Sequence, residues 1–349
     1  MEQTNEKAPA GAQKHRRGWQ FYAKLAVSLA LLAVLFYKCD FASLAANLRQ
    51  ISIPILLLVM VIHFLSNVLC AFRWKLLYPH ASVFTLWTIV MTSGFYSTVL
   101  PGQLFGEASK IVSLSQHSQS DRARVETVAS SVVVDKITSL IALLLLGIAG
   151  AVCGSCVYQA RIAAVLAAVL VVFVFALYIV RFDWCIALIR RILSALSKRF
   201  QKAKKVLRKL DGFFESWREA TKNPRVLLLV VAAGILYHSM LALVLYLTGQ
   251  ALGVTVLFWD WCWIHAIMTV ALLLPITIGG IGLRESTVVG LLGLFGVPTE
   301  RSLLVSFVSF FLQLLAAALG GIIVLTKSIR ARGGTQQPPE TGGKSEVSQ

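Results

Sequence analysis

Long apolar stretches follow one another along this chain with few polar interruptions, and they predict helices that cross a membrane. A helix needs about 20 mostly apolar residues to span the hydrocarbon layer of a bilayer. Six stretches come close to that length: Trp19–Tyr37, Ile51–Cys70, Val128–Val152, Ile162–Val180, Val226–Leu247 and Leu303–Leu325. The pattern therefore predicts an all-α polytopic membrane protein with about six spanning helices.

Two further apolar segments are shorter, and each runs into a proline and a glycine-rich stretch that carries a glutamate. The segment Phe84–Leu100 continues as PGQLFGE, and the segment Trp263–Leu274 continues as PITIGGIGLRE. Interrupted segments at matching places in two halves of a chain point to the midplane binding site of a transporter. We predict two re-entrant helical hairpins, over residues 84–114 and 263–296. Hydropathy leaves open that one or both segments cross completely, which would give up to eight spanning segments.

Basic residues indicate how the chain is threaded, because Lys and Arg are enriched in cytoplasmic loops. The N-terminal region is basic, and the last apolar segment is followed by Lys327, Arg330 and Arg332. Between Arg181 and Arg225 there are 13 Lys and Arg residues against 4 Asp and Glu residues. Both termini and this central loop are therefore expected in the cytoplasm. The first hairpin then enters from the cytoplasmic side and the second from the outside.

This threading gives each half an odd number of crossings, so the second half is inverted relative to the first. Residues 19–152 are expected to form the first membrane repeat and residues 153–327 the second. The polar ends, residues 1–18 and 328–349, are expected to be disordered and cytoplasmic. Non-helical backbone at membrane depth must be satisfied by protein or by a water-filled cavity. The two hairpins should therefore face each other inside the bundle.

Composition supports a membrane protein and excludes several other classes. Hydrophobic residues make up 57% of the 349 residues, charged residues only 14%, and the mean hydropathy is +0.75. Most of the net charge of +17 is explained by topology, so no nucleic-acid partner is expected. In the loop 181–225, apolar residues recur at near-helical spacing beside Lys and Arg. Two interpretations stay open, an amphipathic helix on the anionic lipids of the inner leaflet and a solvated basic linker.

Charged residues at membrane depth are the main candidates for function. Each costs about 2.5–3.5 kcal/mol to insert and therefore needs a partner or a role. The candidates are Arg73, Glu107, Lys110, Asp135, Lys136, Arg284 and Glu285. Glu107 and Lys110 have the spacing of an ion pair on one helical face. Two interpretations of these seven residues stay open. Either they line a polar cavity between the hairpins, where Arg73, Lys110 or Arg284 binds an anionic headgroup and the carboxylates set the charge or carry protons, or they form a salt-bridge network that only holds the broken helices together.

The prolines and glycines of the two motifs complete the candidate site. Helix N-termini that follow Gly102 and Gly280 would offer backbone donors and positive dipole ends, which suit a phosphate. Close helix packing is the alternative explanation of these glycines. The motif residues assigned to the site are Pro101, Gly102, Gly106, Pro275, Gly279, Gly280 and Gly282.

Histidine and tryptophan residues in the apolar segments are interpreted as structural. Three histidines lack metal-ligand spacing and are expected to be hydrogen-bonded core residues: His63, His238 and His265. Three tryptophans at alternate positions are expected to form an aromatic belt at the outer interface: Trp259, Trp261 and Trp263. No metal or cofactor is expected.

The motifs together resemble those of the lysylphosphatidylglycerol synthase transmembrane region family, whose members are also called flippase-like membrane proteins. The resemblance covers roughly Trp19–Lys327 and is carried by four stretches: residues 73–77, residues 101–110, Asp135-Lys136 and residues 274–285. Phe105 stands where the family's first motif would have a glycine. In bifunctional members the membrane domain is implied to move an aminoacylated phospholipid between leaflets after a soluble domain has made it. No such domain follows Leu325 here, so the resemblance implies lipid handling and not lipid aminoacylation.

We expect a lipid translocase in a bacterial inner membrane that moves an anionic or modified phospholipid, or another lipid-linked molecule. The first alternative is a membrane enzyme such as a lipid-linked glycosyltransferase, with Glu107, Asp135 or Glu285 as general base. No Asp-x-Asp motif or P-loop is present, which favours transport. The second alternative is a scaffold for lipid synthesis, and the oligomeric state stays open.

Overall fold

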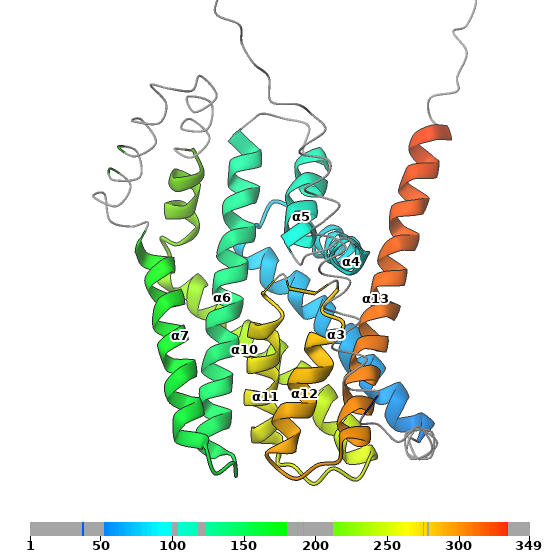
Figure 1. Cartoon of the computed structure of the whole chain (residues 1–349). Coiled ribbons are helices and arrows are strands. Elements are labelled where there is room, and N and C mark those ends of the chain that lie inside the picture. The colour runs from blue at the N-terminus through cyan, green and yellow to red at the C-terminus, as the bar shows by residue number, and fades with distance from the viewer. Residues whose placement is uncertain are drawn as a thin grey trace, which may run out of the picture.

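The fold is helical throughout the part of the chain that the structure describes. The structure is a computed structural model, and it describes residues 37, 52–99, 104–117, 123–179, 187, 191, 212–274, 276–277 and 279–333. The labelled helices of Figure 1 are α3 (Ile53–Leu77), α4 (Val83–Val99), α5 (Leu104–His117), α6 (Ala123–Cys153), α7 (Gln159–Ile179), α10 (Pro224–Ala251), α11 (Phe258–Ala271), α12 (Leu283–Gly293) and α13 (Thr299–Gly333). Residues 212–220 are also helical.

Four of these helices are long and apolar enough to cross a membrane, over Ile53–Leu77, Val125–Cys153, Pro224–Ala251 and Thr299–Lys327. The prediction of an all-helical, multi-pass membrane protein is thereby confirmed, while the number of crossings and the repeat stay predictions. The predicted first helix, most of the loop 181–225, and the motif residues Pro101, Gly102 and Pro275 lie outside the described residues. Helix α13 continues to Gly333, beyond the expected end of the second repeat at residue 327.

Local sequence explains where several helices begin. Pro54 stands in the first turn of α3, where its missing N–H is not needed by the helix. Asn223 caps α10 by accepting a hydrogen bond from the Arg225 N–H, and Pro224 follows at the first helical position. At α4, the Ser82 hydroxyl accepts from the Thr85 N–H at 3.0 Å.

One order of elements occurs twice in the described chain: a long helix, two short helices and another long helix. It is formed first by α3, α4, α5 and α6, and then by α10, α11, α12 and α13. The first helices of the two sets, α3 and α10, pack against each other and run in opposite directions (Figure 1). The short pairs lie in opposite halves of the bundle. The α11–α12 pair is in the half where α6 ends and α13 begins, and the α4–α5 pair is in the other half (Figure 1).

The chain reverses between α11 and α12 within a few residues, and three glycines make this reversal possible. Gly279, Gly280 and Gly282 have φ angles of 62°, 80° and 85°. These values lie in the left-handed region, where a Cβ atom is strongly disfavoured. The bend lies near mid-height in the bundle, so it reaches the interior (Figure 1).

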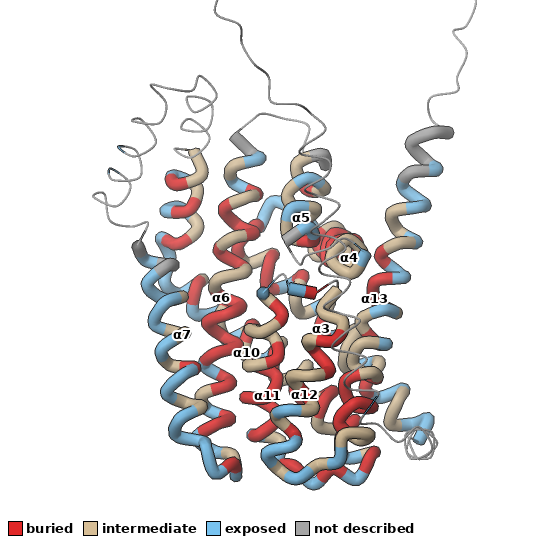
Figure 2. Tube along the Cα trace, viewed as in Figure 1, coloured by how far each residue is buried: buried red, intermediate tan, exposed pale blue. Residues whose placement is uncertain are grey.

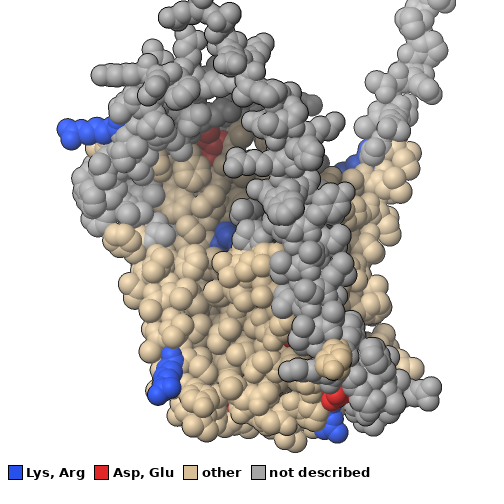
Figure 3. Space-filling view, viewed as in Figure 1, with Lys and Arg blue, Asp and Glu red and all other residues tan. Residues whose placement is uncertain are grey.

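Helix α6 is the centre of the bundle. Within its most apolar window 67% of the residues are buried, against 17–28% for the other three long candidate spans. Figure 2 shows a mostly red α6, and beside it the shorter helix α7 is mostly pale blue. Many of the exposed side chains of α3 and α7 are large and apolar, as expected for surfaces that face lipid. The face seen in Figure 3 likewise carries few charged side chains between its two ends.

The expected tryptophan belt is wrong for two of its three members. Trp261 and Trp263 are fully buried on α11, and only Trp259 is exposed. The two buried rings pack with Leu143 and Leu144 of α6 in one hydrophobic cluster. The two buried aromatic side chains therefore stabilise the contact between α11 and α6. Of the three tryptophans, only Trp259 is exposed in a way that suits an interfacial position.

Close packing at this contact gives a testable prediction. A Cβ atom on Gly150 of α6 would lie 2.5 Å from the Trp259 carbonyl oxygen and 2.7 Å from Cys262 Cβ. We expect Gly150→Ala to lower the free energy of unfolding by about 1–3 kcal/mol, as overpacking does. The matched control is Gly290→Ala, because Gly290 is helical with nothing within 4 Å of its added Cβ. Thermal unfolding of the purified protein in detergent measures both variants, and equal midpoints would contradict the packing described.

Candidate functional site

Two adjoining cavities lie among the short helices and their long neighbours. The smaller one, of about 150 Å³, is lined by residues of α4 and α5, of the connection between α11 and α12, and of α6 and α13, and we call it the hairpin cavity. The larger one, of about 320 Å³, is lined by residues of α3, α4, α6, α10, α11, α12 and α13, and we call it the central cavity. Lys136, Leu272 and Gln313 line both cavities and form their common boundary.

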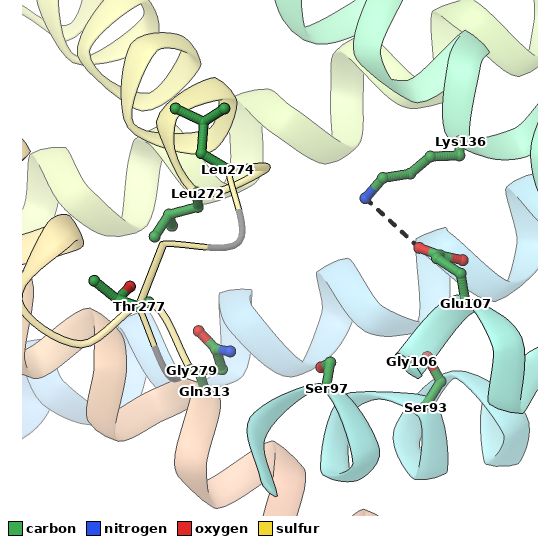
Figure 4. Close-up of a pocket in the computed structure, with 11 residues that line it drawn as sticks. Ser93, Ser97, Gly106, Glu107, Lys136, Leu272, Leu274, Thr277, Gly279 and Gln313 are labelled. Carbon is green, nitrogen blue, oxygen red and sulfur yellow. Dashed lines mark ion pairs between the residues drawn. The ribbon is translucent and has the colours of Figure 1, made fainter. Parts of the chain in front are cut away.

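The hairpin cavity has polar walls that come from different parts of the chain. Figure 4 shows Leu272, Leu274 and Thr277 on one side and the Lys136–Glu107 pair on the opposite side, with Ser97 of α4 below. The bend of the second hairpin approaches α4 closely, since a Cβ on Gly279 would lie 3.5 Å from the Thr98 carbonyl oxygen. The two short-helix pairs therefore meet at this cavity.

Glu107 is the carboxylate of the hairpin cavity, and two lysines neutralise it. Its Oε2 lies 2.9 Å from Lys110 Nζ, one turn along α5, and its Oε1 lies 3.6 Å from Lys136 Nζ on α6. The predicted pair between Glu107 and Lys110 is thus present. The Lys110 ammonium is buried and lies 5.8 Å from the centre of the Trp74 ring. Lys136 is more exposed and borders both cavities, so its ammonium is the one available to a ligand.

Arg73 and Asp135 form a separate buried pair that lines neither cavity. Asp135 Oδ1 accepts from Arg73 Nε at 2.9 Å and lies 2.8 Å from Nη2. The guanidinium carbon is also 5.6 Å from the centre of the Tyr237 ring. Asp135 and Lys136 are adjacent on α6 and point about 100° apart, which explains why they serve different partners. This pair ties α3 to α6 behind the cavity walls.

Arg284 and Glu285, adjacent in the second motif, have different environments. Glu285 turns back on the start of its own helix, where its Oε2 accepts from the Gly282 N–H at 2.6 Å and its Oε1 accepts from the Ser306 hydroxyl at 3.4 Å. It thereby caps α12 and complements the positive end of the helix dipole. Glu285 lines neither cavity.

Arg284 lines the central cavity and is buried. Its Nη2 donates to Gln313 Oε1 at 2.6 Å, and its guanidinium carbon lies 4.8 Å from the centre of the Phe310 ring. Within the described ranges no carboxylate comes within 4.0 Å of it. The arginine is thus held by an amide and an aromatic ring, with no ion-pair partner in that part of the chain.

The structure brings together some of the predicted site residues and not others. Those that line a cavity are Gly106, Glu107, Lys136, Gly279, Gly280 and Arg284. Those with buried or supporting positions outside the linings are Arg73, Lys110, Asp135, Gly282 and Glu285. The described residues contain no group of three or more His, Cys, Asp and Glu side chains that could hold a metal ion.

Sequence reasoning missed the polar lining of the central cavity. His238 and His265, interpreted as ordinary core residues, both line it and are hydrogen-bonded to each other at 3.2 Å. They stand 27 positions apart on different helices, so no local spacing connects them. Gln313 was missed for the same reason, although a single glutamine inside the apolar run of α13 is a signal that could have found it.

Comparison with known proteins gives one match. The sequence profile of the family described as "Lysylphosphatidylglycerol synthase TM region" matches residues 21–321. No curated protein and no solved structure matches the chain significantly.

The Arg73–Asp135 pair gives a second prediction. Asp135→Ala leaves a buried guanidinium without its counter-ion, and breaking a buried pair in this way costs about 3–5 kcal/mol. The double variant Arg73→Met/Asp135→Ala removes the charge as well and should regain most of that loss. Thermal unfolding in detergent compares the two variants, with the exposed Glu219→Ala as control. A single variant as stable as the wild type would show that the pair does not hold α3 to α6.

Proposed function

The chain belongs to the lysylphosphatidylglycerol synthase TM region family, and we propose that it moves a lipid with an anionic, phosphate-bearing headgroup between the leaflets of the membrane. Membership of the family supports a membrane protein that handles lipids. The remaining argument rests on the two cavities and on the charges that face them.

Arg284 is the observation that carries the proposal. A buried cation is expensive unless an anion or a dense set of hydrogen bonds compensates it. Arg284 has Gln313 and the face of Phe310, and no carboxylate within ion-pair distance among the described residues. A phosphate bound in the central cavity would supply the missing charge, and the planar guanidinium suits its oxygen atoms. Lys136, on the common boundary, would be the second cation available to it.

Cavity size favours binding of the headgroup alone. Pockets that enclose a drug-sized molecule measure about 300–1,000 Å³. The central cavity, at about 320 Å³, is at the lower end of that range. A phosphate with its attached polar group suits this volume, and the acyl chains would remain in the bilayer. The large apolar side chains exposed on α3 are the kind of surface along which such chains could lie.

We further infer that the α4–α5 and α11–α12 pairs are re-entrant hairpins of an inverted repeat. Their positions in opposite halves of the bundle, with the hairpin cavity between them, support this arrangement. A site at the meeting point of two inverted hairpins can open to either leaflet as one hairpin moves against the other. The distribution of basic residues supports cytoplasmic termini in a bacterial inner membrane, with residues 181–225 near its anionic lipids.

The proposal is tested in liposomes that contain the purified protein and headgroup-labelled phosphatidylglycerol. The rate at which inner-leaflet label becomes accessible to an impermeant quencher should rise well above that of empty liposomes. Arg284→Gln should lower this rate by about tenfold or more, since one charge-assisted hydrogen bond is worth about 1.5–3 kcal/mol. Folding should survive, because removing a buried charge that has no counter-ion is not destabilising in itself.

The matched control is Arg301→Gln, because Arg301 lies at the start of α13, outside both cavities, and donates to the Gly253 carbonyl oxygen. Glu107→Gln reports on the hairpin cavity in the same assay. No acceleration over empty liposomes with neutral, anionic and aminoacylated lipids would reject the proposal. Equal loss of rate in Arg284→Gln and Arg301→Gln would reject the assigned site.

A further inference from the structure

Three side chains on three helices form a continuous hydrogen-bonded chain in the wall of the central cavity. His265 Nε2 on α11 lies 3.2 Å from His238 Nδ1 on α10. His238 Nε2 lies 3.1 Å from the hydroxyl oxygen of Ser139 on α6, and also 3.1 Å from the Ser139 carbonyl oxygen. All three residues are buried, and all three line the central cavity.

The carbonyl oxygen of Ser139 determines one arrangement of the protons. A carbonyl only accepts, so His238 Nε2 carries a proton when it bonds to that oxygen. In a neutral His238 ring the Nδ1 atom is then an acceptor, and His265 Nε2 must donate to it. This arrangement leaves His265 Nδ1 without a proton.

The hydroxyl group of Ser139 allows the opposite arrangement at the same distance. If the hydroxyl donates to His238 Nε2, then Nδ1 of that ring carries the proton and donates to His265 Nε2. His265 Nδ1 then carries a proton of its own. The same nitrogen thus faces a pure acceptor and a donor, both at 3.1 Å, so both tautomers of the chain find partners without movement of the backbone.

The far end of the chain is open. His265 Nδ1 is buried and has no hydrogen-bond partner within the part of the chain that the structure describes. Buried polar atoms are nearly always paired, and an exception needs an explanation. This atom carries a proton in one arrangement and not in the other, so a partner that only donates or only accepts would suit one arrangement alone.

We propose that Ser139, His238 and His265 form a proton relay beside the headgroup site. A proton that arrives at His265 Nδ1 releases the Nε2 proton of that ring to His238 Nδ1. The Nε2 proton of His238 then passes to the Ser139 hydroxyl, whose own proton leaves into the central cavity. One proton enters and one leaves, so the relay keeps its charge while both rings change tautomer. The reverse transfer, or a flip of both rings, resets it.

The end of the relay at His265 Nδ1 is not accessible to solvent in the present conformation, which prevents continuous proton leakage. His265 and Ser139 both line the central cavity, but the Nδ1 atom of His265 is buried and closed off from solvent. The relay can therefore take up a proton at the α11 end only when this helix moves. Movement of α11 is also what alternating access of the second hairpin requires, so the inference that proton movement accompanies headgroup movement rests on the proposed function.

The charged side chains around the relay favour proton transfer when an anion is bound in the central cavity. Besides the relay histidines, the titratable or charged side chains that line the central cavity are His63 of α3, Lys136 of α6, Tyr237 of α10 and Arg284 of α12. The nearest carboxylates outside this lining are Asp135, Asp260 and Glu285 on the same helices and Glu107 on α5. The Asp135 carboxylate is paired with Arg73, and the Glu285 carboxylate accepts a hydrogen bond from the Gly282 N–H at the start of α12. Asp260 accepts from Ser155 and Trp263. Lys136 shares Glu107 with Lys110, and Arg284 has no carboxylate within ion-pair distance among the described residues. Net positive charge thus remains at the cavity, and it opposes a passing proton until an anionic headgroup offsets it.

The test uses full-length protein in liposomes with labelled phosphatidylglycerol and a pH difference between inside and outside. We expect the rate of lipid exchange to change at least about fivefold with the direction of the pH difference, the lower end of typical coupling between two sites. His238→Asn and His265→Gln should remove this dependence, because an amide can hydrogen-bond but cannot relay a proton. His80→Gln is the matched control, since His80 is exposed and outside both cavities.

Two results are distinguishable. Lipid exchange in the wild type that does not respond to the pH difference would overturn the relay and leave the proposed function standing. Absence of lipid exchange would reject the proposed function for the lipids used, and the relay is then decided by nitrogen-15 NMR of histidine-labelled protein in bilayers. Exchange of the His265 rings between two tautomers that stops in His238→Asn would support the relay. A single His265 tautomer at every pH would overturn it.

Discussion

The cost of charge inside a bilayer governs the arrangement of this bundle. Each ionised side chain at membrane depth needs compensation, and the partners come from elements far apart in the sequence. Asp135 of α6 holds Arg73 of α3, and Glu107 of α5 lies between Lys110 and Lys136. These pairs tie α3, α5 and the central helix α6 together, so the helices cannot separate without exposing a charge to hydrocarbon. Arg284 differs from the other cations in its lack of such a partner among the described residues, and for that reason it points to a ligand.

The two glutamates of the repeated motifs differ in what they do, although their spacing from a glycine is the same. Both stand in the first turn of a short helix, where a carboxylate is favoured by the helix dipole. The carboxylate oxygens of Glu285 accept hydrogen bonds from the Gly282 N–H at the start of its own helix and from the Ser306 hydroxyl. The carboxylate oxygens of Glu107 instead form ion pairs with two lysines, Lys110 and Lys136, beside the hairpin cavity. Glutamates at matching positions of the two motifs thus serve helix capping in one case and polar contact at a cavity in the other.

Features that depend on local sequence could be predicted, and features that depend on packing could not. Apolar length gave the long helices, and one helical turn between Glu107 and Lys110 gave their ion pair. The burial of Trp261 and Trp263 was missed because alternate tryptophans look alike in an interfacial belt and in a contact with another helix. The meeting of His238 and His265 depends on how α10 lies against α11, and no period in the sequence encodes that crossing.

The glycine bend between α11 and α12 also limits how such a protein can change over evolution. Three residues within four positions have backbone angles that other side chains rarely adopt, which leaves little room for variation. Two of them, Gly279 and Gly280, line the hairpin cavity, so this stretch of its wall offers bare backbone. New preferences for a ligand must then arise elsewhere on the wall. Leu272 and Gln313 carry side chains there on a backbone of right-handed helical conformation. Divergence among proteins with this bend should therefore be concentrated in the walls around it, while the bend itself stays the same.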